Sequence, residues 1–334
     1  MSNTVQFNVW ATGYAEATAE YFRLNGDPSL VVRQVADTQS RSGQTLTAHI
    51  YQICMVIEGL NALDKLLNGR SGLQELRREL LVVVRELFNK SGFHYFDQGY
   101  LPEDLDTLAM VTRVASVCSP EILEAYNSAL LRNGAKDYRY PTWLDTTNWQ
   151  ALCCGPDPWH ADVVLNLLAT QCLLGRLLRT QFVVSIAEES ELRNYWYVQR
   201  LYTPFLYYRL VRLAGLEDVE GVITPLQIAL SREDLNNRGN DGRMLELVSN
   251  VQHRPFDMLL RHLLGTFVDG HSRDLEIPNF GPDEFNDIVL YWSFGYAPYV
   301  SLPVSRSFVA TVLGTFLLDP CSARSGCQRG LAHR

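Results

Sequence analysis

Two carboxylates at the start of an apolar helix are the residues of this sequence best suited to acid chemistry. Asp104 and Asp106 lie two positions apart in the segment YLPEDLDTLAMVTRV. Protonation of an alkene or an epoxide needs a carboxylic acid that stays neutral until it is used. Burial and the repulsion of a neighbouring carboxylate both favour the neutral form. The sequence therefore predicts Asp106 and Asp104 as a catalytic acid pair, and Thr107 is placed to donate a hydrogen bond to one of them.

Helix capping is the alternative explanation for the same residues. Glu103, Asp104 and Asp106 directly follow Pro102, and acidic residues in a first helical turn are favoured because they pair with amide groups that have no partner within the helix. This pattern explains the three acids without any function. Both interpretations stay open at this point.

Aromatic residues gather in the segments that precede the apolar helices. Aromatic faces stabilise a carbocation through their quadrupole, at roughly 0.5–2 kcal/mol each, although ordinary core packing explains many such rings. If the acid interpretation is correct, these side chains line the substrate cavity together with Thr107. The aromatic candidates are Trp149, Trp159, Trp196, Tyr197, Tyr202, Phe205, Trp292, Phe294, Tyr296 and Tyr299.

A second polar pair lies on another apolar helix. Asp162 and Asn166 are four residues apart, so they share one face of that helix and are able to bond to each other or to a ligand. We include both among the substrate-binding candidates. A role in starting the helix is the alternative for Asp162, and the adjacent His160 is interpreted as an exposed loop residue.

Apolar and amphipathic helical segments alternate along the chain, and signals for β-strands are sparse. Such a pattern favours helical hairpins in a closed ring, a single all-α (α/α)6 barrel with apolar inner and half-polar outer helices. We expect one domain over residues 1–320 and a disordered tail over 321–334. The expected helices are Leu46–Leu67, Leu73–Phe88, Leu105–Val117, Pro120–Leu131, Ala161–Leu178, Phe205–Ala214, Val222–Leu230, Met244–Val251, Phe256–Leu264, Glu284–Trp292 and Val304–Leu318.

Composition restricts the partners of this chain. The 334 residues are 47% hydrophobic and carry a net charge of −8 without a basic block, which argues against nucleic acid as a partner. No signal peptide or run long enough to cross a bilayer is recognisable, and seven irregularly spaced cysteines favour a reducing, cytoplasmic location. The sequence contains no convincing signature for a metal or a cofactor, so none is predicted.

Several segments together resemble the α/α-toroid superfamily of squalene–hopene cyclases, oxidosqualene cyclases and other class II terpene cyclases. LPEDLDTLAMVTRV is similar to the acid motif Asp-x-Asp-Asp followed by Thr-Ala of that superfamily, with Asp104 first, Asp106 as the central donor and Thr107 in place of the last Asp. Oxidosqualene cyclases also lack that last Asp, and they start from an epoxide. The other similar segments are Asp157–Leu167, Tyr195–Leu213 and Tyr291–Phe316.

The resemblance implies an enzyme that protonates and cyclises an isoprenoid, a polyene or an epoxide-bearing natural product, so an apolar small molecule is the expected partner. Triterpene cyclases build their cavity between two such domains, whereas this chain is long enough for one, and a homodimer would supply the second half. Two alternatives remain: a toroid enzyme with a different, non-cyclising reaction, and a toroid that only binds a lipid-like ligand or a partner protein.

Overall fold

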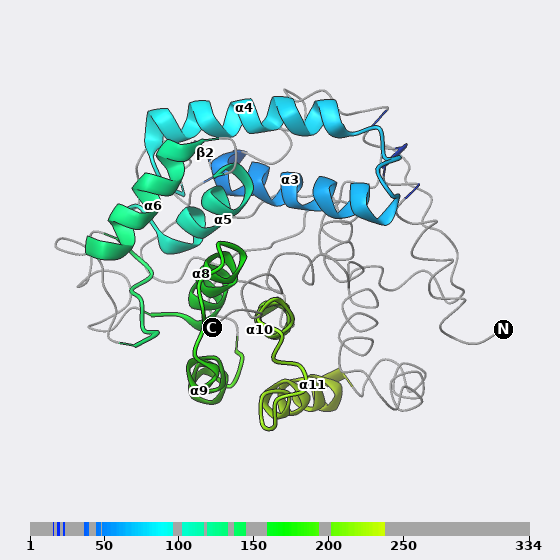
Figure 1. Ribbon diagram of the computed structural model, residues 1–334, viewed down its shortest axis with the longest axis vertical. Coiled ribbons are helices and arrows are strands. Elements are labelled where there is room, and N and C mark those ends of the chain that lie inside the picture. The colour runs from blue at the N-terminus through cyan, green and yellow to red at the C-terminus, as the bar shows by residue number, and fades with distance from the viewer. Residues whose placement is uncertain are drawn as a thin grey trace, which may run out of the picture.

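The protein is helical in the part of the chain that the computed structural model describes (Figure 1). The described helices are α3 His49–Leu66, α4 Gln74–Ser91, α5 Leu105–Ala115, α6 Pro120–Arg132, α8 Ala161–Leu173, α9 Thr180–Ser190, α10 Tyr202–Leu213 and α11 Thr224–Asn237. The structure describes residues 16, 19, 20, 23, 37–39, 45–47, 49–95, 102–116, 119–132, 137–144, 159–193 and 202–237.

Two short strands precede the first of these helices, and the sequence analysis did not anticipate them. β1 Asp37–Gln39 and β2 Thr45–Thr47 pair antiparallel, with Thr38 opposite Leu46. Each strand has three residues, too few to produce a recognisable alternation of apolar and polar residues.

One expected helix is shorter than predicted, and another helix was not predicted. The helix expected over Ala161–Leu178 ends at Leu173, and Gly175 beyond it takes up the left-handed conformation with φ 77°. A glycine with positive φ is a common end of a helix. α9 then follows over residues that had been assigned to no helix, and α10 begins at Tyr202, three residues before the expected start at Phe205.

Buried and half-buried helices alternate along the described chain. All residues from Ala161 to Cys172 in α8 are buried, and most residues of α5 are buried too. α4 instead buries one stripe, Leu76, Leu80 and Val84, with the spacing of one helical face. The expected alternation of inner and outer helices is therefore present in this part of the chain.

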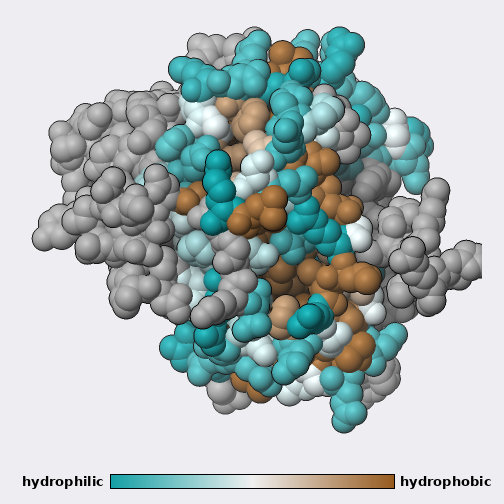
Figure 2. Space-filling model, turned by 60° about the vertical axis from the view of Figure 1, so that its left-hand side comes forward, coloured by the Kyte–Doolittle hydropathy of each residue, from teal (hydrophilic) through white to brown (hydrophobic). Residues whose placement is uncertain are grey.

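The inner helices α3, α5, α8 and α10 pack against one another in chain order, and α4, α6, α9 and α11 pack against them from outside (Figure 1). Figure 2 shows that hydrophilic side chains cover the upper and lower parts of one face of the molecule, while apolar ones gather between them. None of the described helices is long and apolar enough to cross a membrane.

The all-α class is confirmed for the described residues. The helices expected beyond Asn237 and the expected tail over 321–334 lie outside the described part, so the closed (α/α)6 ring and the single domain stay predictions.

Candidate functional site

Short backbone bridges place the first residue of the acid pair. Glu103 forms an antiparallel bridge with His94, and Asp104 forms one with Trp143. The amide of Asp104 also donates a hydrogen bond of 3.2 Å to the carbonyl of Phe93. The segment that leads into α5 is thus held between the end of α4 and the chain before α8, which fixes where α5 begins.

Asp104 is the N-cap of α5. Its side chain is 4% exposed, and its Oδ1 accepts a hydrogen bond of 2.7 Å from the amide of Thr107. The Thr107 hydroxyl, also buried, donates to the other oxygen of Asp104 at 2.8 Å. The capping interpretation is therefore correct for Asp104, and the expected hydrogen bond from Thr107 to one carboxylate is present.

The capping hydrogen bonds do not keep the carboxyl group of Asp104 ionised. Burial raises the pKa of Asp104 to about 8, and the charge of Asp106 adds to this increase, while the two hydrogen bonds from Thr107 oppose it. Asp104 therefore retains a proton at neutral pH next to the carboxyl group of Asp106, and a proton donor requires such a neutral acid.

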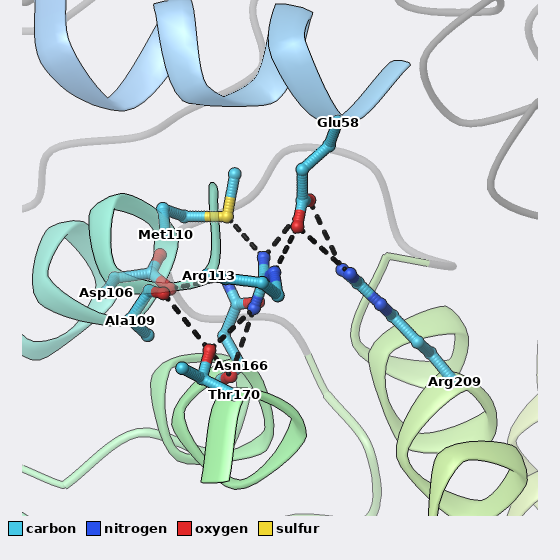
Figure 3. A network of polar contacts seen from close by, with 8 residues as sticks. All are labelled: Glu58, Asp106, Ala109, Met110, Arg113, Asn166, Thr170 and Arg209. Carbon is cyan, nitrogen blue, oxygen red and sulfur yellow. Dashed lines mark hydrogen bonds and ion pairs between the residues drawn. The ribbon is translucent and has the colours of Figure 1, made fainter. Parts of the chain in front are cut away.

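Asp106 points away from the cap and toward α8. It is half-buried in the first turn of α5, and the amide Nδ2 of Asn166 donates a hydrogen bond of 2.6 Å to its Oδ1 (Figure 3). Asn166 is fully buried, and its Oδ1 has no hydrogen-bond partner in the described structure. Two candidates that are 60 residues apart in the sequence are thus brought together.

A buried ionic cluster lies between three of the inner helices, and none of its members was predicted from the sequence. Glu58 from α3 pairs with Arg113 from α5 and with Arg209 from α10, the latter at 3.1 Å (Figure 3). The side chain of Glu58 is 6% exposed and that of Arg113 4%. Each of the three is a charged residue within an apolar stretch of helix, and this is the signal that could have revealed them, because a buried charge needs a partner.

The ionic cluster holds its carboxylate in the charged form. Burial by itself favours the neutral acid, but the guanidinium groups of Arg113 and Arg209 and their hydrogen bonds outweigh it, so the pKa of Glu58 is lowered. Glu58 is therefore ionised at neutral pH, in contrast to the acid pair on α5.

Arg113 also connects α5 to α8. Its Nη1 donates to the hydroxyl of Thr170 at 3.0 Å and to the carbonyl of Asn166 at 3.3 Å. The Thr170 hydroxyl in turn donates to the carbonyl of Ala109 at 3.1 Å. Because Asp106 meets Asn166 and Ala109 meets Thr170, the two helices advance in the same direction along this contact.

Two residues beside the start of α8 lie in a separate cluster. Trp159 is half-buried and meets the edge of the Tyr138 ring, with 5.9 Å between the ring centroids. His160 is half-buried and not exposed as expected, and its Nδ1 lies 2.6 Å from the hydroxyl of Thr142. Burial lowers the pKa of His160 to about 4, so this side chain is neutral at physiological pH.

Three further candidates lie on described helices. Asp162 is fully buried in the first turn of α8, and its Oδ1 accepts a hydrogen bond of 3.0 Å from the amide of Val163. Tyr202 and Phe205 belong to α10, where the structure does not describe their side chains. The candidates outside the described residues are Trp149, Trp196, Tyr197, Trp292, Phe294, Tyr296 and Tyr299.

Within the described residues, no group of three or more His, Cys, Asp or Glu side chains is arranged to hold a metal ion. Comparisons of the chain with protein-family models, with curated proteins and with solved structures find no match. A function for this chain is therefore inferred from the geometry of the acid pair and of its partner on α8.

Proposed function

We propose that this protein is a class II terpene cyclase-like enzyme in which Asp106 acts as the general acid. The substrate is an apolar isoprenoid or polyene, or a natural product that carries one, with an alkene or an epoxide as the group that is protonated. The observation that carries this proposal is the buried Asp104 beside Asp106, since burial and the like charge of Asp106 keep the carboxyl group of Asp104 protonated at neutral pH.

The two carboxyl groups have different parts in this mechanism. Both oxygens of Asp104 are engaged by Thr107, so Asp104 serves as the enclosed partner that helps the pair keep its proton. Asp106 is the less enclosed member, and its Oδ1 accepts a hydrogen bond from Asn166. In this proposal the proton that the pair holds is delivered to the substrate from the carboxyl group of Asp106.

Proton transfer from Asp106 starts the reaction. The proton adds to an alkene carbon or to an epoxide oxygen, and the π electrons or the breaking C–O bond leave a carbocation. Neighbouring double bonds of the folded substrate attack that cation and close rings, and loss of a proton ends the sequence. Substrate and product therefore have the same mass in the simplest case.

Asp106→Asn tests this proposal directly. The amide keeps an oxygen that is able to accept from Asn166 but has no acidic proton. Linear farnesyl and geranylgeranyl compounds and their terminal epoxides are incubated with the purified protein, and products are analysed by gas chromatography and mass spectrometry. We expect cyclic isomers from the wild-type protein and a loss of at least about a hundredfold in the variant, as is usual when a general acid is removed.

Glu124→Gln is the matched control, because Glu124 is an exposed carboxylate on the outer helix α6. It should form product at the wild-type rate. Equal product formation by Asp106→Asn and the wild-type protein would end the assignment of Asp106 as the acid. Products whose mass differs from that of the substrate would favour a non-cyclising reaction instead.

The cap geometry supports a second candidate function, a toroid that binds a lipid-like ligand without turnover. Both oxygens of Asp104 accept hydrogen bonds from Thr107, and this capping role explains the residue without catalysis. In that case a fluorescent farnesyl probe should bind equally well to the wild-type protein and to a variant with both aspartates changed to Asn, and no probe should be converted.

A further inference from the structure

Asn166 makes a single hydrogen bond through its side chain in the described structure. Nδ2 donates to Asp106, and no described group bonds to Oδ1. A side-chain amide with one partner is not locked in orientation by its own contacts. Its position on Asp106 therefore depends on where the backbone of α8 is held.

Arg113 holds that backbone. Nη1 of Arg113 donates to the carbonyl of Asn166 itself, at 3.3 Å, and to the hydroxyl of Thr170, one helical turn further along α8, at 3.0 Å. Arg113 is seven residues beyond Asp106, so the two side chains lie on the same face of α5, two turns apart. One arginine thus binds the main chain of the residue whose side chain binds the acid.

Glu58 fixes Arg113 from the opposite side. Nε and Nη2 of Arg113 face the two oxygens of Glu58, with 3.1 Å between Nη2 and Oε2 (Figure 3). A guanidinium group with such a paired contact has a defined plane, which directs its remaining N–H groups toward α8. A lysine offers no such fork of donors.

We propose that Arg113 is a positioning residue for the acid: anchored by Glu58, it holds α8 in the register that keeps the Asn166 amide on Asp106. This inference rests on the proposed role of Asp106. It adds a device that the acid motif itself does not contain, since its members come from α3, α5 and α8.

Arg113→Lys is the main test, because it keeps the positive charge beside Glu58 but cannot bind Glu58 and α8 together. The first readout is the side-chain amide signal of Asn166 in the NMR spectrum of the ¹⁵N-labelled full chain, assigned by its loss in Asn166→Ala. We expect this signal to move or broaden. The second readout is turnover of the substrate found active: kcat should fall about tenfold to a hundredfold, with KM nearly unchanged.

Thr170→Val and Thr170→Ser form a matched pair that leaves Arg113 and Glu58 intact. The valine removes the hydroxyl that Arg113 binds, together with its hydrogen bonds to the carbonyls of Ala109 and Asn166, and should also move the Asn166 signal. Serine keeps the hydroxyl and should restore the signal and most of kcat. Arg85→Lys, at an exposed arginine of α4, is the control that should change neither readout. If Arg113→Lys does not fold, the Thr170 pair decides.

An Asn166 signal at its wild-type position in Arg113→Lys or, should that variant not fold, in Thr170→Val would overturn the inference, as would a moved signal with kcat unchanged. Failure of the proposed function is distinguishable from both outcomes. If the wild-type protein converts no substrate, the acid assignment and the catalytic part of this inference fail together, while the NMR signal still decides whether Arg113 positions Asn166.

Discussion

Two buried carboxyl groups beside α5 are in opposite states, Asp104 at the start of this helix and Glu58 of α3 opposite Arg113 near its end. At its start, Asp104 is enclosed beside a second carboxylate, and its pKa is raised to about 8. Two turns beyond Asp106, Arg113 faces Glu58, whose pKa is lowered although it is just as buried. The difference is produced by the neighbours: a like charge adds to the effect of burial at one end, and two guanidinium groups overcome it at the other.

This contrast distinguishes a carboxyl group that is able to donate a proton from one that stabilises the fold as an ion-pair partner. A carboxyl group that keeps its proton is able to give it away, whereas a carboxylate ionised by two arginines is a fixed counter-charge. Asp104 caps α5 and Glu58 pairs with Arg113 of the same helix, so burial beside α5 does not by itself decide the role of a carboxyl group. The following changes test the contrast, beginning with the largest expected effect.

Removing the charge of Glu58 should have the largest effect on stability. Glu58→Gln leaves Arg113 and Arg209 beside each other without their shared carboxylate, and breaking a buried ion pair on one side typically costs about 3–5 kcal/mol. Urea unfolding followed by circular dichroism measures the free energy of unfolding. Glu75→Gln is the control, since its pair with Arg78 is exposed, and exposed pairs contribute only about 0–1 kcal/mol. Equal losses in the two variants would contradict the structural role of the ionic cluster.

Asp104, at the start of α5, should make the free energy of unfolding depend on pH. Asp104 has a folded-state pKa of about 8 against an ordinary value of 3.8, so the folded chain holds a proton that the unfolded chain releases. This contribution destabilises the fold as pH rises from about 4 to about 8, by up to about 1.4 kcal/mol per pH unit. Asp104→Asn keeps a good N-cap residue and should remove the dependence.

Thermal unfolding of both proteins at a series of pH values checks this prediction. The variant should gain stability relative to the wild-type protein as pH rises, and the difference should level off above pH 8. A difference that grows toward low pH instead would mean that Asp104 is an ordinary ionised cap, and the contrast between the two ends of α5 would disappear.

The smallest effect is expected where the chain leads into the acid pair. Gly92 ends α4 with φ 62° and ψ −134°, and an added Cβ would collide with the carboxylate of Glu103, which accepts from the amide of Phe93 at 2.9 Å. Gly92→Ala should cost roughly 2–3 kcal/mol. Gly69→Ala, at another positive φ with open space around it, should cost about 1–2 kcal/mol. Urea unfolding compares them, and equal costs would show that Glu103 yields without penalty.

The helices were predictable from the sequence where apolar periodicity and a clear stop coincide. α5 and α6 were predicted to within two residues at each end because Pro102 and Pro120 mark their beginnings. α8 was predicted to run on to Leu178 because apolar residues continue past Leu173, whereas the chain leaves the helix there and Gly175 is left-handed. The backbone conformation of a single glycine in an apolar run cannot be predicted from the sequence.

The site was predictable only in part, for a physical reason. Spacing along one helix identified Asp104, Thr107 and Asp106, and the four-residue spacing from Asp162 identified Asn166. Local spacing has no information on which helix faces which, so the contact between Asp106 and Asn166 came from the structure. The ionic cluster was missed because its three charges lie on three different helices, each within a largely apolar stretch.

In the proposed mechanism, the position of Asp106 in the first turn of α5 has a consequence for the moment after proton transfer. The aligned peptide groups of a helix place about half a positive charge at its N-terminus, which stabilises a nearby anion by roughly 0.3–1 kcal/mol. Once Asp106 has lost its proton, the helix itself therefore supports the conjugate base. The N-terminus of α5, which encloses the acid pair, would therefore also stabilise the ionised form of Asp106. One structural element would affect both the enclosure and the acid strength of this carboxyl group.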